Sequence, residues 1–437
     1  MGAAACAPPV ADPREILARP RARSIDGWHS QPARAEWLDA ALPDYGAATG
    51  TDLSIRWTQV PDPARLVQTL LITINSGAAF PDIVDLDPSW GGRITRLAPS
   101  PLLALQDRLK GGSHDFVQAA FTDPWTVGGR VHALASELNL VLLGYRTDVY
   151  SASGVRAPLP TWDDAIDAGR RVAARAPDGL FFVRADAAGT VLALATQAGG
   201  GFVGRGGVLQ LDHPANVRAL GFLESLVNRD RAAAVLPFDR PGGNRPGGDM
   251  LGDAARAAFR SGSVAGDIGP MARLSGEMRV DAPETAGRWH VQALPRWPGA
   301  PARQPGVVVP GSGLAVLKES PAVDLAADFV TWAHLGHAPL LDFERRQTWP
   351  VNRRLYEDPR LADPVPWFHG QSVGTILREA SASVVACAQG PYWPEIARVL
   401  TPAIRAVMNG QADARGALAE AQIAARALVV QAGGSPG

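Results

Sequence analysis

Apolar and polar positions along the chain follow two different periods, which predicts a succession of strands and helices. Residues 52–60 read DLSIRWTQV, where apolar side chains occupy alternate positions as in a strand with one buried face. Residues 63–76 instead place leucine and isoleucine at helical spacing, and Gly77 follows where this helix would end. Residues 81–87 form a short apolar segment typical of a buried strand. Such alternation predicts an α/β fold with a mostly parallel sheet and helices on both faces.

The rest of the chain continues this alternation. Thr161 is a residue type that caps helices, so a helix is predicted to begin there and to run to about residue 175. Asp163 and Asp164 would lie in its first turn, where negative charge interacts favourably with the helix dipole. The other expected elements are helices over 37–45, 190–197, 216–229, 253–260 and 320–335, strands over 208–211, 289–294, 307–309 and 313–317, and two alanine-rich helices over 395–430 that separate near Asn409. Residues 237–248 (PFDRPGGNRPGG) are predicted to form a flexible surface loop.

Composition and charge exclude several classes of protein. The 437 residues suffice for two or three domains, and 46% hydrophobic with 19% charged residues is ordinary for a globular protein. The 42 basic and 43 acidic residues leave a formal net charge of −1, so no positive excess favours nucleic acid or an anionic membrane as a partner. No apolar run approaches the ~18 residues that a membrane-spanning helix needs.

The N-terminal segment resembles the end of a bacterial lipoprotein signal. Small residues precede Cys6, and a stretch rich in proline and alanine follows it, although an alanine rather than a leucine lies three residues before the cysteine. Two interpretations stay open. Cys6 is either a lipid attachment site or a free thiol in a tail, and residues 6–24 form a tether in both cases.

No catalytic or metal-binding motif is evident. Residues 199–204 fit the pattern G-x-G-x-x-G, but they follow a helix and precede a strand, the reverse of the order in a dinucleotide site. His334 and His337 share a helix face without a third ligand nearby, so packing or surface roles are expected. Cys387 lies in an apolar run and is expected to be a small buried hydrophobic residue. We therefore expect no catalytic residue, no metal and no cofactor.

Tryptophan is the more informative residue type, with 12 tryptophans against 5 tyrosines. Trp37, Trp57 and Trp332 fit the apolar faces of their elements and are predicted core residues. Others occupy loops or the ends of elements, namely Trp28, Trp90, Trp349, Trp367 and Trp393. An indole offers a flat apolar face and one N–H donor, which suits the C–H faces and hydroxyl edges of a sugar ring. Ordinary burial is the alternative for each of them, because amphipathic side chains also pack in cores.

The order of several short motifs resembles that of the extracellular solute-binding proteins of ABC sugar importers, the maltose-binding-like family. These motifs are 76–84 (SGAAFPDIV), 145–150 (YRTDVY), 160–164 (PTWDD), 258–265 (AFRSGSVA), 311–317 (GSGLAVL) and 349–351 (WPV). The resemblance covers 25–430. One departure is Tyr145-Arg146, where the family commonly has Tyr-Asn-Lys.

The resemblance implies a two-lobe periplasmic-binding-protein-like fold of type II, with a hinge that the chain crosses three times. The implied parts are a tether at 1–24, a first lobe of 25–140 plus 307–343, and a second lobe of 141–306 plus 344–437. The crossings would lie near 137–143, 304–309 and 343–349. The ligand would bind between the lobes, at loops beyond the carboxyl ends of strands, and would favour the closed arrangement.

The implied ligand-binding residues come from both lobes and from the hinge. Aromatic rings among them would stack on sugar rings, while Gln31, Asp87, Glu137 and Asn139 would form hydrogen bonds with hydroxyl groups. The full set is Trp28, His29, Ser30, Gln31, Asp87, Trp90, Glu137, Asn139, Gly201, Phe202, Gly269, Met271, Gly311, Ser312 and Trp349. The structural alternative for any one of them is a turn or capping residue, since several of these types favour turns.

The resemblance implies a binding protein, not an enzyme, that delivers a mono- or oligosaccharide to the permease subunits of an ABC transporter. It would act as a monomer outside the cytoplasm, in the periplasm or at the cell surface. An enzyme on a two-lobe fold is one alternative, although no acid–base motif supports it. Another is a receptor for a glycerophosphodiester or other phosphate-bearing solute, a polyamine or a peptide. All but two of the 42 basic residues are arginines, which pair well with phosphate oxygens.

Overall fold

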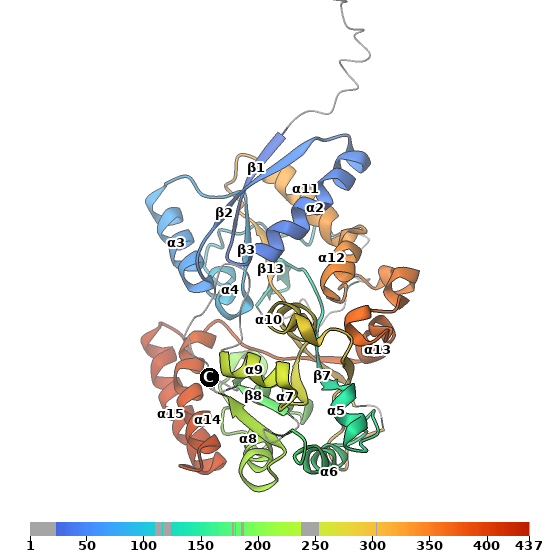
Figure 1. The fold of residues 1–437 in the computed structure, drawn as a ribbon. Helices are drawn as coiled ribbons and strands as arrows, with labels where there is room; N and C mark the ends of the chain where they lie inside the picture. Colours follow the sequence, from blue (N-terminus) through green and yellow to red (C-terminus); the bar gives the residue numbers. More distant parts are fainter. Residues whose placement is uncertain are drawn as a thin grey trace, which may run out of the picture.

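The computed structural model describes residues 23–436 apart from 110–115, 117–123, 177–178, 180, 185–187, 237–252 and 303. In Figure 1 these residues form two lobes stacked one above the other, each built on its own β-sheet. The two-lobe α/β fold expected from the sequence is thereby confirmed. Cys6 and the loop predicted for 237–248 lie outside the described residues.

The first lobe is built on a five-stranded sheet. Across the sheet the strands are β2 (Leu53–Gln59), β1 (Arg23–His29), β3 (Ile83–Leu86), β13 (Gly313–Val316) and β6 (Leu134–Ala135). β1 pairs in parallel with β2 and β3, whereas β13 is antiparallel to both of its neighbours. The carboxyl ends of the three parallel strands therefore lie at one edge of this sheet, where ligands of α/β proteins usually bind.

Helices cover both faces of the first sheet (Figure 1). They are α2 (Pro32–Thr49), α3 (Pro63–Ser76), α4 (Pro88–Thr95), α11 (Val323–Leu335) and α12 (Ala338–Arg346). The carboxylate of Asp62 caps α3 by accepting a hydrogen bond from the backbone amide of Arg65 at 2.9 Å. The helix ends at Gly77, whose φ of 69° is one that residues with side chains rarely adopt. Both ends of α3 are confirmed as predicted.

The second lobe is built on a seven-stranded sheet. In order its strands are β14 (Val384–Ala386), β12 (Gly306–Val309), β7 (Asn139–Arg146), β10 (Gly266–Pro270), β8 (Phe181–Arg184) and β9 (Ala233–Leu236), and β11 (Trp289–Ala293) also pairs with β7. The long strand β7 is antiparallel to β10 along one side and to β11 and β12 in succession along the other. This strand is therefore the centre of the second sheet.

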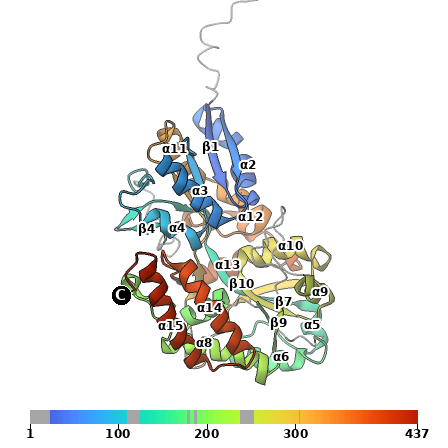
Figure 2. The ribbon, with the colours of Figure 1, turned by 90° about the vertical axis from the view of Figure 1, so that its left-hand side faces the viewer.

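The second lobe also has helices on both faces of its sheet. They are α5 (Thr147–Ala152), α6 (Trp162–Val172), α7 (Ala188–Gln197), α8 (Pro214–Glu224), α9 (Asp253–Ser261), α10 (Met278–Asp281), α13 (Val373–Ser381), α14 (Trp393–Met408) and α15 (Ala414–Gln431). The helix predicted after Thr161 begins with reciprocal hydrogen bonds between Thr161 and Asp164. The C-terminal helices α14 and α15 pack side by side and separate at Asn409, as predicted (Figure 2).

Two apolar clusters fill the molecule, and β7 separates them. Leu140 and Leu142 belong to the cluster that runs from the first lobe through the junction to α13. Val141 and Leu143 point to the opposite face, into the cluster beneath α7, α8, α14 and α15. This division follows from the alternation of side chains along a strand. The first lobe and the junction therefore share one continuous core.

Among the described residues, three segments of the chain cross between the lobes. Residues 136–138 join β6 to β7, residues 310–312 join β12 to β13, and residues 347–352 follow α12. The crossings lie side by side, because the amide of Leu138 donates to the carbonyl oxygen of Trp349 at 2.8 Å and that of Ser136 to Ser312 at 3.0 Å. The lobes are thus joined by a small hydrogen-bonded ribbon.

Strand pairing shifts the lobe boundaries expected from the sequence by a few residues. Residues 139–140 pair within the second sheet, as do 307–309, although the sequence predicted both in the first lobe. Arg23 and Ser24, expected in the tether, pair with β2. The physical reason is that a strand stays in its sheet until its last ladder hydrogen bond, and motif spacing does not specify that residue.

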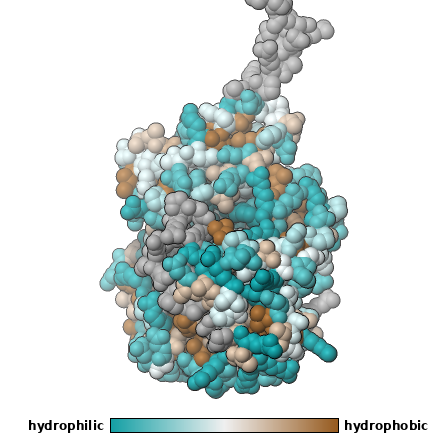
Figure 3. Space-filling view, viewed as in Figure 1, coloured by the Kyte–Doolittle hydropathy of each residue, from teal (hydrophilic) through white to brown (hydrophobic). Residues whose placement is uncertain are grey.

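Exposed hydrophobic residues are dispersed over the surface of the described part of the chain. Hydrophilic residues predominate on the face drawn in Figure 3, and hydrophobic residues form only small separate patches. The exposed large hydrophobic residues are scattered over both lobes, at Ile72, Leu97, Val208, Val280, Ile423 and Val430. Among the described residues, no helix combines the length and apolar character needed to cross a membrane.

Candidate functional site

Several predicted ligand-binding residues gather at the carboxyl end of β1. Trp28 and His29 are the last two residues of that strand, and Ser30 and Gln31 connect it to α2. Trp28 is half-buried, whereas His29 and Ser30 are almost fully buried. Burial also lowers the pKa of the His29 imidazole, which favours its neutral form. This turn therefore presents one large ring and several polar groups at the edge of the first sheet.

Asp87 and Trp90 follow the neighbouring strand at the same edge. Asp87 caps α4, because its carboxylate accepts a hydrogen bond from the amide of Ser89 at 2.8 Å. Burial raises the pKa of this carboxyl group above its ordinary value. Trp90, one turn into α4, is half-buried, and the guanidinium of Arg93 lies 5.3 Å from its ring centre. Asp87 thus has a structural role of its own, while part of the Trp90 ring stays accessible.

The crossing segments supply the next group of predicted residues. Glu137 is 4% exposed and forms an ion pair with Arg34 of α2. A side chain on Gly311 would bring its Cβ to 2.8 Å from the carbonyl oxygen of Glu137, so only glycine fits there. Ser312 is buried between the crossings. Asn139 connects β7 to the segment after β10 by accepting a hydrogen bond from the amide of Ala272 at 3.3 Å.

A set of buried charges lies beside these crossings. Arg34 is 3% exposed and interacts with the carboxylates of Asp85 and Asp342 in addition to its ion pair with Glu137. Both carboxylate oxygens of Asp342 have hydrogen-bond donors, since they accept from Arg346 and from the hydroxyl of Thr348, each at 2.6 Å. We call this set of residues the junction cluster: Arg34, Asp85, Glu137, Asp342 and Arg346.

Three members of the junction cluster have unused hydrogen-bonding groups, one of them Glu137, whose Oε2 has an ion-pair contact with Arg34 but no hydrogen-bond partner among the described residues. Asp85 is only 2% exposed, and no group in the described part of the chain donates a hydrogen bond to its carboxylate. Burial raises the pKa of Asp85 to about 7; Arg34 opposes this rise, and the negative charges of Glu137 and Asp87 add to it. The Nε and Nη1 atoms of Arg34 are buried without a hydrogen-bond partner among the described residues. Such unpaired groups are rare in folded proteins and require an explanation.

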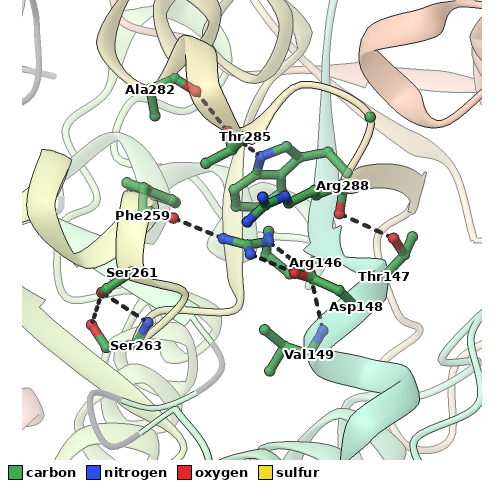
Figure 4. A network of polar contacts seen from close by, with 12 residues as sticks. Arg146, Thr147, Asp148, Val149, Phe259, Ser261, Ser263, Ala282, Thr285 and Arg288 are labelled. Atoms are coloured by element: carbon green, nitrogen blue, oxygen red, sulfur yellow. Dashed lines mark hydrogen bonds and ion pairs between the residues drawn. The ribbon is translucent and has the colours of Figure 1, made fainter.

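Arg146 in the second lobe shows how a buried arginine is satisfied when its role is structural. It donates to the two carboxylate oxygens of Asp148 at 2.8 and 2.6 Å and to the carbonyl oxygen of Phe259 at 2.9 Å (Figure 4). Its guanidinium also lies 5.8 Å from the ring centre of Trp289. The arginine that departs from the family pattern after Tyr145 therefore ties β7 to α9.

Three predicted ligand-binding residues with large apolar side chains lie inside the cores instead. Phe202 is fully buried and stacks on Trp393, with ring centres 6.3 Å apart. Met271 is 1% exposed. Trp349 is fully buried, and its ring packs against Tyr356 at 4.8 Å. Their position near a strand end suggested a ligand role, but each one fills space between packed elements, so the structure does not bring them to the accessible edge.

The two predicted glycines of the second lobe have backbone roles. Gly201 donates its amide to Asn216 and accepts from the same side chain, both at 2.8 Å. Gly269 lies within β10, opposite Leu142 of β7. The glycine-rich segment 199–204 is therefore a structured turn, as expected. Of the predicted residues, Asp87 after β3 and Glu137 of the first crossing both lie close enough to Asp85 for their charges to raise its pKa.

Four charged residues of the junction cluster were missed at the sequence level. Arg34 occupies a position of α2 that shares one face with Trp37, Leu38 and Ala41, so it is an arginine within an apolar stripe. Asp85 is a carboxylate inside the four-residue buried strand β3. A charge at a core-facing position is costly unless it is paired or used, and this signal could have identified both residues. Asp342 and Arg346 carried no comparable signal.

The histidine and cysteine predictions are confirmed. His334 is fully buried, donates from Nδ1 to the carbonyl oxygen of Val330 at 2.7 Å, and has its pKa lowered by burial to about 4. Cys387 is fully buried in the second core, and burial raises the pKa of its thiol to about 12. Within the described residues, no three histidine, cysteine, aspartate or glutamate side chains are grouped to hold a metal ion.

Comparison with known sequences gives one family and several relatives. Residues 29–333 match the profile of the family described as bacterial extracellular solute-binding protein. An arabinooligosaccharide-binding protein of Halalkalibacterium halodurans is 23% identical over 367 residues, which cover 79% of this chain and 78% of the relative. A protein of the same description from Bacillus subtilis is 26% identical over 326 residues, 71% of each chain.

Comparison with solved structures supports the same architecture. The sugar-binding protein MalE from Xanthomonas citri superposes with a TM-score of 0.75 at 15% identity, covering 94% of this chain and 98% of that one. An ABC transporter associated binding protein from B. animalis subsp. lactis Bl-04, solved with β-1,6-galactobiose, gives a TM-score of 0.72 at 20% identity, covering 95% and 99%. At these identities the match establishes the two-lobe fold.

Proposed function

Because the chain belongs to the bacterial extracellular solute-binding protein family, we propose that it binds a carbohydrate between its lobes and delivers it to an ABC transporter. The names of its relatives support a sugar, since two of them are arabinooligosaccharide-binding proteins. The solved relatives with the same fold include complexes with a galactobiose and with maltose. The arrangement at the edge of the first sheet supports this choice independently.

The observation that carries the proposal is the combination of half-buried rings and unpaired polar groups at one edge. Trp28 and Trp90 keep part of their ring surface accessible. Asp85 of β3 and Arg34 of α2 have a free acceptor and free donors with respect to the described residues. A sugar combines apolar C–H faces with hydroxyl groups that both donate and accept hydrogen bonds. A neutral carbohydrate therefore matches both halves of this surface.

The charge balance of the junction disfavours a phosphate-bearing solute. The junction cluster holds three carboxyl groups against two guanidinium groups, and Asp87 adds a further carboxyl group nearby. Arg346 is already engaged with Asp342, and Arg34 with Glu137. A phosphodiester would bring another negative charge close to these carboxylates, where repulsion is strong because burial reduces screening. Arg34 and Arg346 are the arginines of the junction cluster, so the high arginine content of the chain does not make this site positively charged.

Calorimetric titration of the purified chain tests the proposal. The ligands are arabinotriose, maltotriose, β-1,6-galactobiose and, as the phosphate-bearing alternative, glycerophosphocholine. We expect saturable binding of at least one saccharide, a matching rise in melting temperature, and no binding of glycerophosphocholine. Recovery of the saccharide unchanged after incubation separates a binding protein from an enzyme. Binding of glycerophosphocholine alone, or conversion of a saccharide, would overturn the proposal.

The proposed role extends to partners and location. The protein would act outside the cytoplasm as a monomer, and the permease subunits would recognise its closed, sugar-bound form. Cys6 would carry the lipid that holds it at the membrane. Mass spectrometry of the protein isolated from its native membranes tests this last point, because a diacylated Cys6 is heavier than a thiol by the mass of its lipid. A free Cys6 thiol in that sample would exclude the anchor.

A further inference from the structure

We infer that Asp85 and Arg34 form the pair that reads the hydroxyl groups of the bound sugar and so determines which sugar fits. The inference rests on the proposed function, because it assigns the specificity of the same site. The sequence pattern suggested the capping residue Asp87 and the crossing residue Glu137 for this role. The inference assigns it to Asp85 and Arg34 instead.

The first support is the set of hydrogen-bonding groups that the protein itself leaves unused. The Arg34 guanidinium binds Glu137 through Nη2, which leaves Nε and Nη1 buried and without partners among the described residues. The Asp85 carboxylate interacts with Arg34 only through charge. An unpaired buried group destabilises the protein, more so when it is charged, so a ligand that completes it gains binding free energy.

The second support is the contrast with neighbouring ion pairs whose role is structural. Asp342 has both carboxylate oxygens occupied by Arg346 and Thr348. Arg146 has its guanidinium occupied by Asp148 and Phe259. The Nε and Nη1 atoms of Arg34 and the carboxylate of Asp85 are not completed in this way by any group in the described part of the chain. The unused donors of Arg34 and the unused acceptors of Asp85 fit a partner that comes from outside the chain.

The third support is position. Asp85 is the penultimate residue of β3, whose neighbour β1 ends at His29. The alternation of side chains places Asp85 and His29 on the same face of the sheet, the one covered by α2, which carries Arg34. Trp28, at the alternate position of β1, points to the opposite face of the sheet. A sugar ring lying across this edge would meet indole surface on one side and the Asp85–Arg34 pair on the other.

The chemistry of the pair restricts the ligand to groups that both donate and accept. The carboxylate of Asp85 accepts hydrogen bonds, whereas the Nε–H and Nη1–H groups of Arg34 donate them. Neighbouring hydroxyl groups satisfy both at once: one hydroxyl hydrogen points to Asp85 and one hydroxyl oxygen faces Arg34. A carboxylate or phosphate ligand would leave Asp85 opposed by a like charge, and an amine would do the same to Arg34.

The test compares two variants by calorimetry with the saccharides named above, arabinotriose, maltotriose and β-1,6-galactobiose. Asp85→Asn keeps the shape but removes the charge and one acceptor position. Asp342→Asn is the matched control, because it changes a buried carboxylate of the same cluster that is already fully paired. For a saccharide bound by the wild type, we expect about a tenfold to hundredfold weaker binding in Asp85→Asn, the range of a hydrogen bond to a charged group, and a change of less than about threefold in Asp342→Asn.

Each outcome separates the inference from the proposed function. Wild-type binding that Asp85→Asn leaves unchanged, or that both variants weaken equally, overturns the inference and leaves sugar binding intact. Absence of saccharide binding by the wild type overturns both. If Asp85→Asn does not fold, the wild-type protein is titrated with the saccharide at pH 6 and at pH 8. Its affinity for the saccharide should be higher at pH 8, because the Asp85 carboxyl group is then ionised and accepts hydrogen bonds. An affinity that stays constant overturns the inference. The groups facing Asp85 are Arg34 of α2, Glu137 of the first crossing, Asp87 after β3 and Arg346 of α12.

Discussion

Arg93 of α4 forms an ion pair with Glu395 in the first turn of α14, so a side chain of the first lobe is bonded to one of the second. The backbones approach closely at the same place, since a Cβ on Gly92 would lie 2.8 Å from the Cα of Pro391. The lobes are therefore in direct contact at α4 and α14, in addition to the three crossing segments. A contact of this kind favours the arrangement in which the lobes are together.

Glu395→Gln should shift the protein toward a more open arrangement. The pair is partly exposed, at 32% for Arg93 and 17% for Glu395, so its contribution is no more than about 1 kcal/mol. Affinity for a saccharide should fall about two- to fivefold, and the radius of gyration from solution scattering should increase. The control is Arg56→Gln, which breaks an exposed ion pair with Asp26 inside the first lobe. Equal effects of the two variants would contradict this role of the α4–α14 contact.

Gly92→Ala should separate the lobes by a steric route. The added methyl group would overlap the backbone of Pro391, which has no flexible side chain to move aside. We expect weaker saccharide binding with little change in the melting temperature of the ligand-free protein. Gly221→Ala on α8 is the matched control, because its Cβ would meet no atom within 4 Å and an alanine favours the helix. If titration gave the two variants the same affinity, the close approach at Gly92 would have no part in closure.

Tryptophan substitutions should separate accessible rings from core rings. Trp90→Ala removes a half-buried ring, so we expect a clear loss of saccharide affinity with a modest loss of stability. Trp349→Ala empties a fully buried site against Phe343 and Tyr356, and should lower the free energy of unfolding by about 3–5 kcal/mol. Urea denaturation and titration of both variants give the comparison. A Trp349→Ala protein of normal stability would show that this ring is not part of the core.

Replacing Asp85 should stabilise the ligand-free protein at high pH. The pKa of Asp85 is raised from 3.8 to about 7, so the folded chain holds this proton more tightly than the unfolded chain does. Wild-type stability therefore falls as the pH rises from 4 through 7, and above pH 7 the buried charge costs up to about 4 kcal/mol. Asp85→Asn removes this cost, so it should be more stable than the wild type at pH 8 and nearly equal to it at pH 4. Urea denaturation at both pH values measures the difference, and a less stable variant at pH 8 would contradict the assignment.

Local signals predicted the elements well because neighbouring residues determine them. The bounds of α3 follow from Asp62 and Gly77, and the start of α6 follows from the capping pair of Thr161 with Asp164. The junction cluster is different, since Arg34 and Glu137 are 103 residues apart in the chain. Their pairing depends on how α2 lies against the first crossing, which no periodicity records.

The accessibility of individual tryptophans was likewise beyond local signals. Trp28, Trp90 and Trp349 all occupy ends of elements in the sequence pattern, yet the first two are half-buried and the third is fully buried. The difference arises because Phe343 and Tyr356, from either side of the third crossing, enclose the ring of Trp349. Whether a ring at the end of a strand is buried depends on segments from other parts of the chain that pack against it. The order of motifs in the sequence does not show which segments these are.

The order of strands also bears on how the chain folds. The first sheet lacks an inner strand until residues 313–316 are available, and the outermost strand of the second sheet comes from residues 384–386. Neither half can close its hydrogen-bond ladder while the chain is still short, and pairing partners are separated by long loops, which slows folding. A chain emerging from the ribosome would thus stay incompletely folded until synthesis is nearly finished.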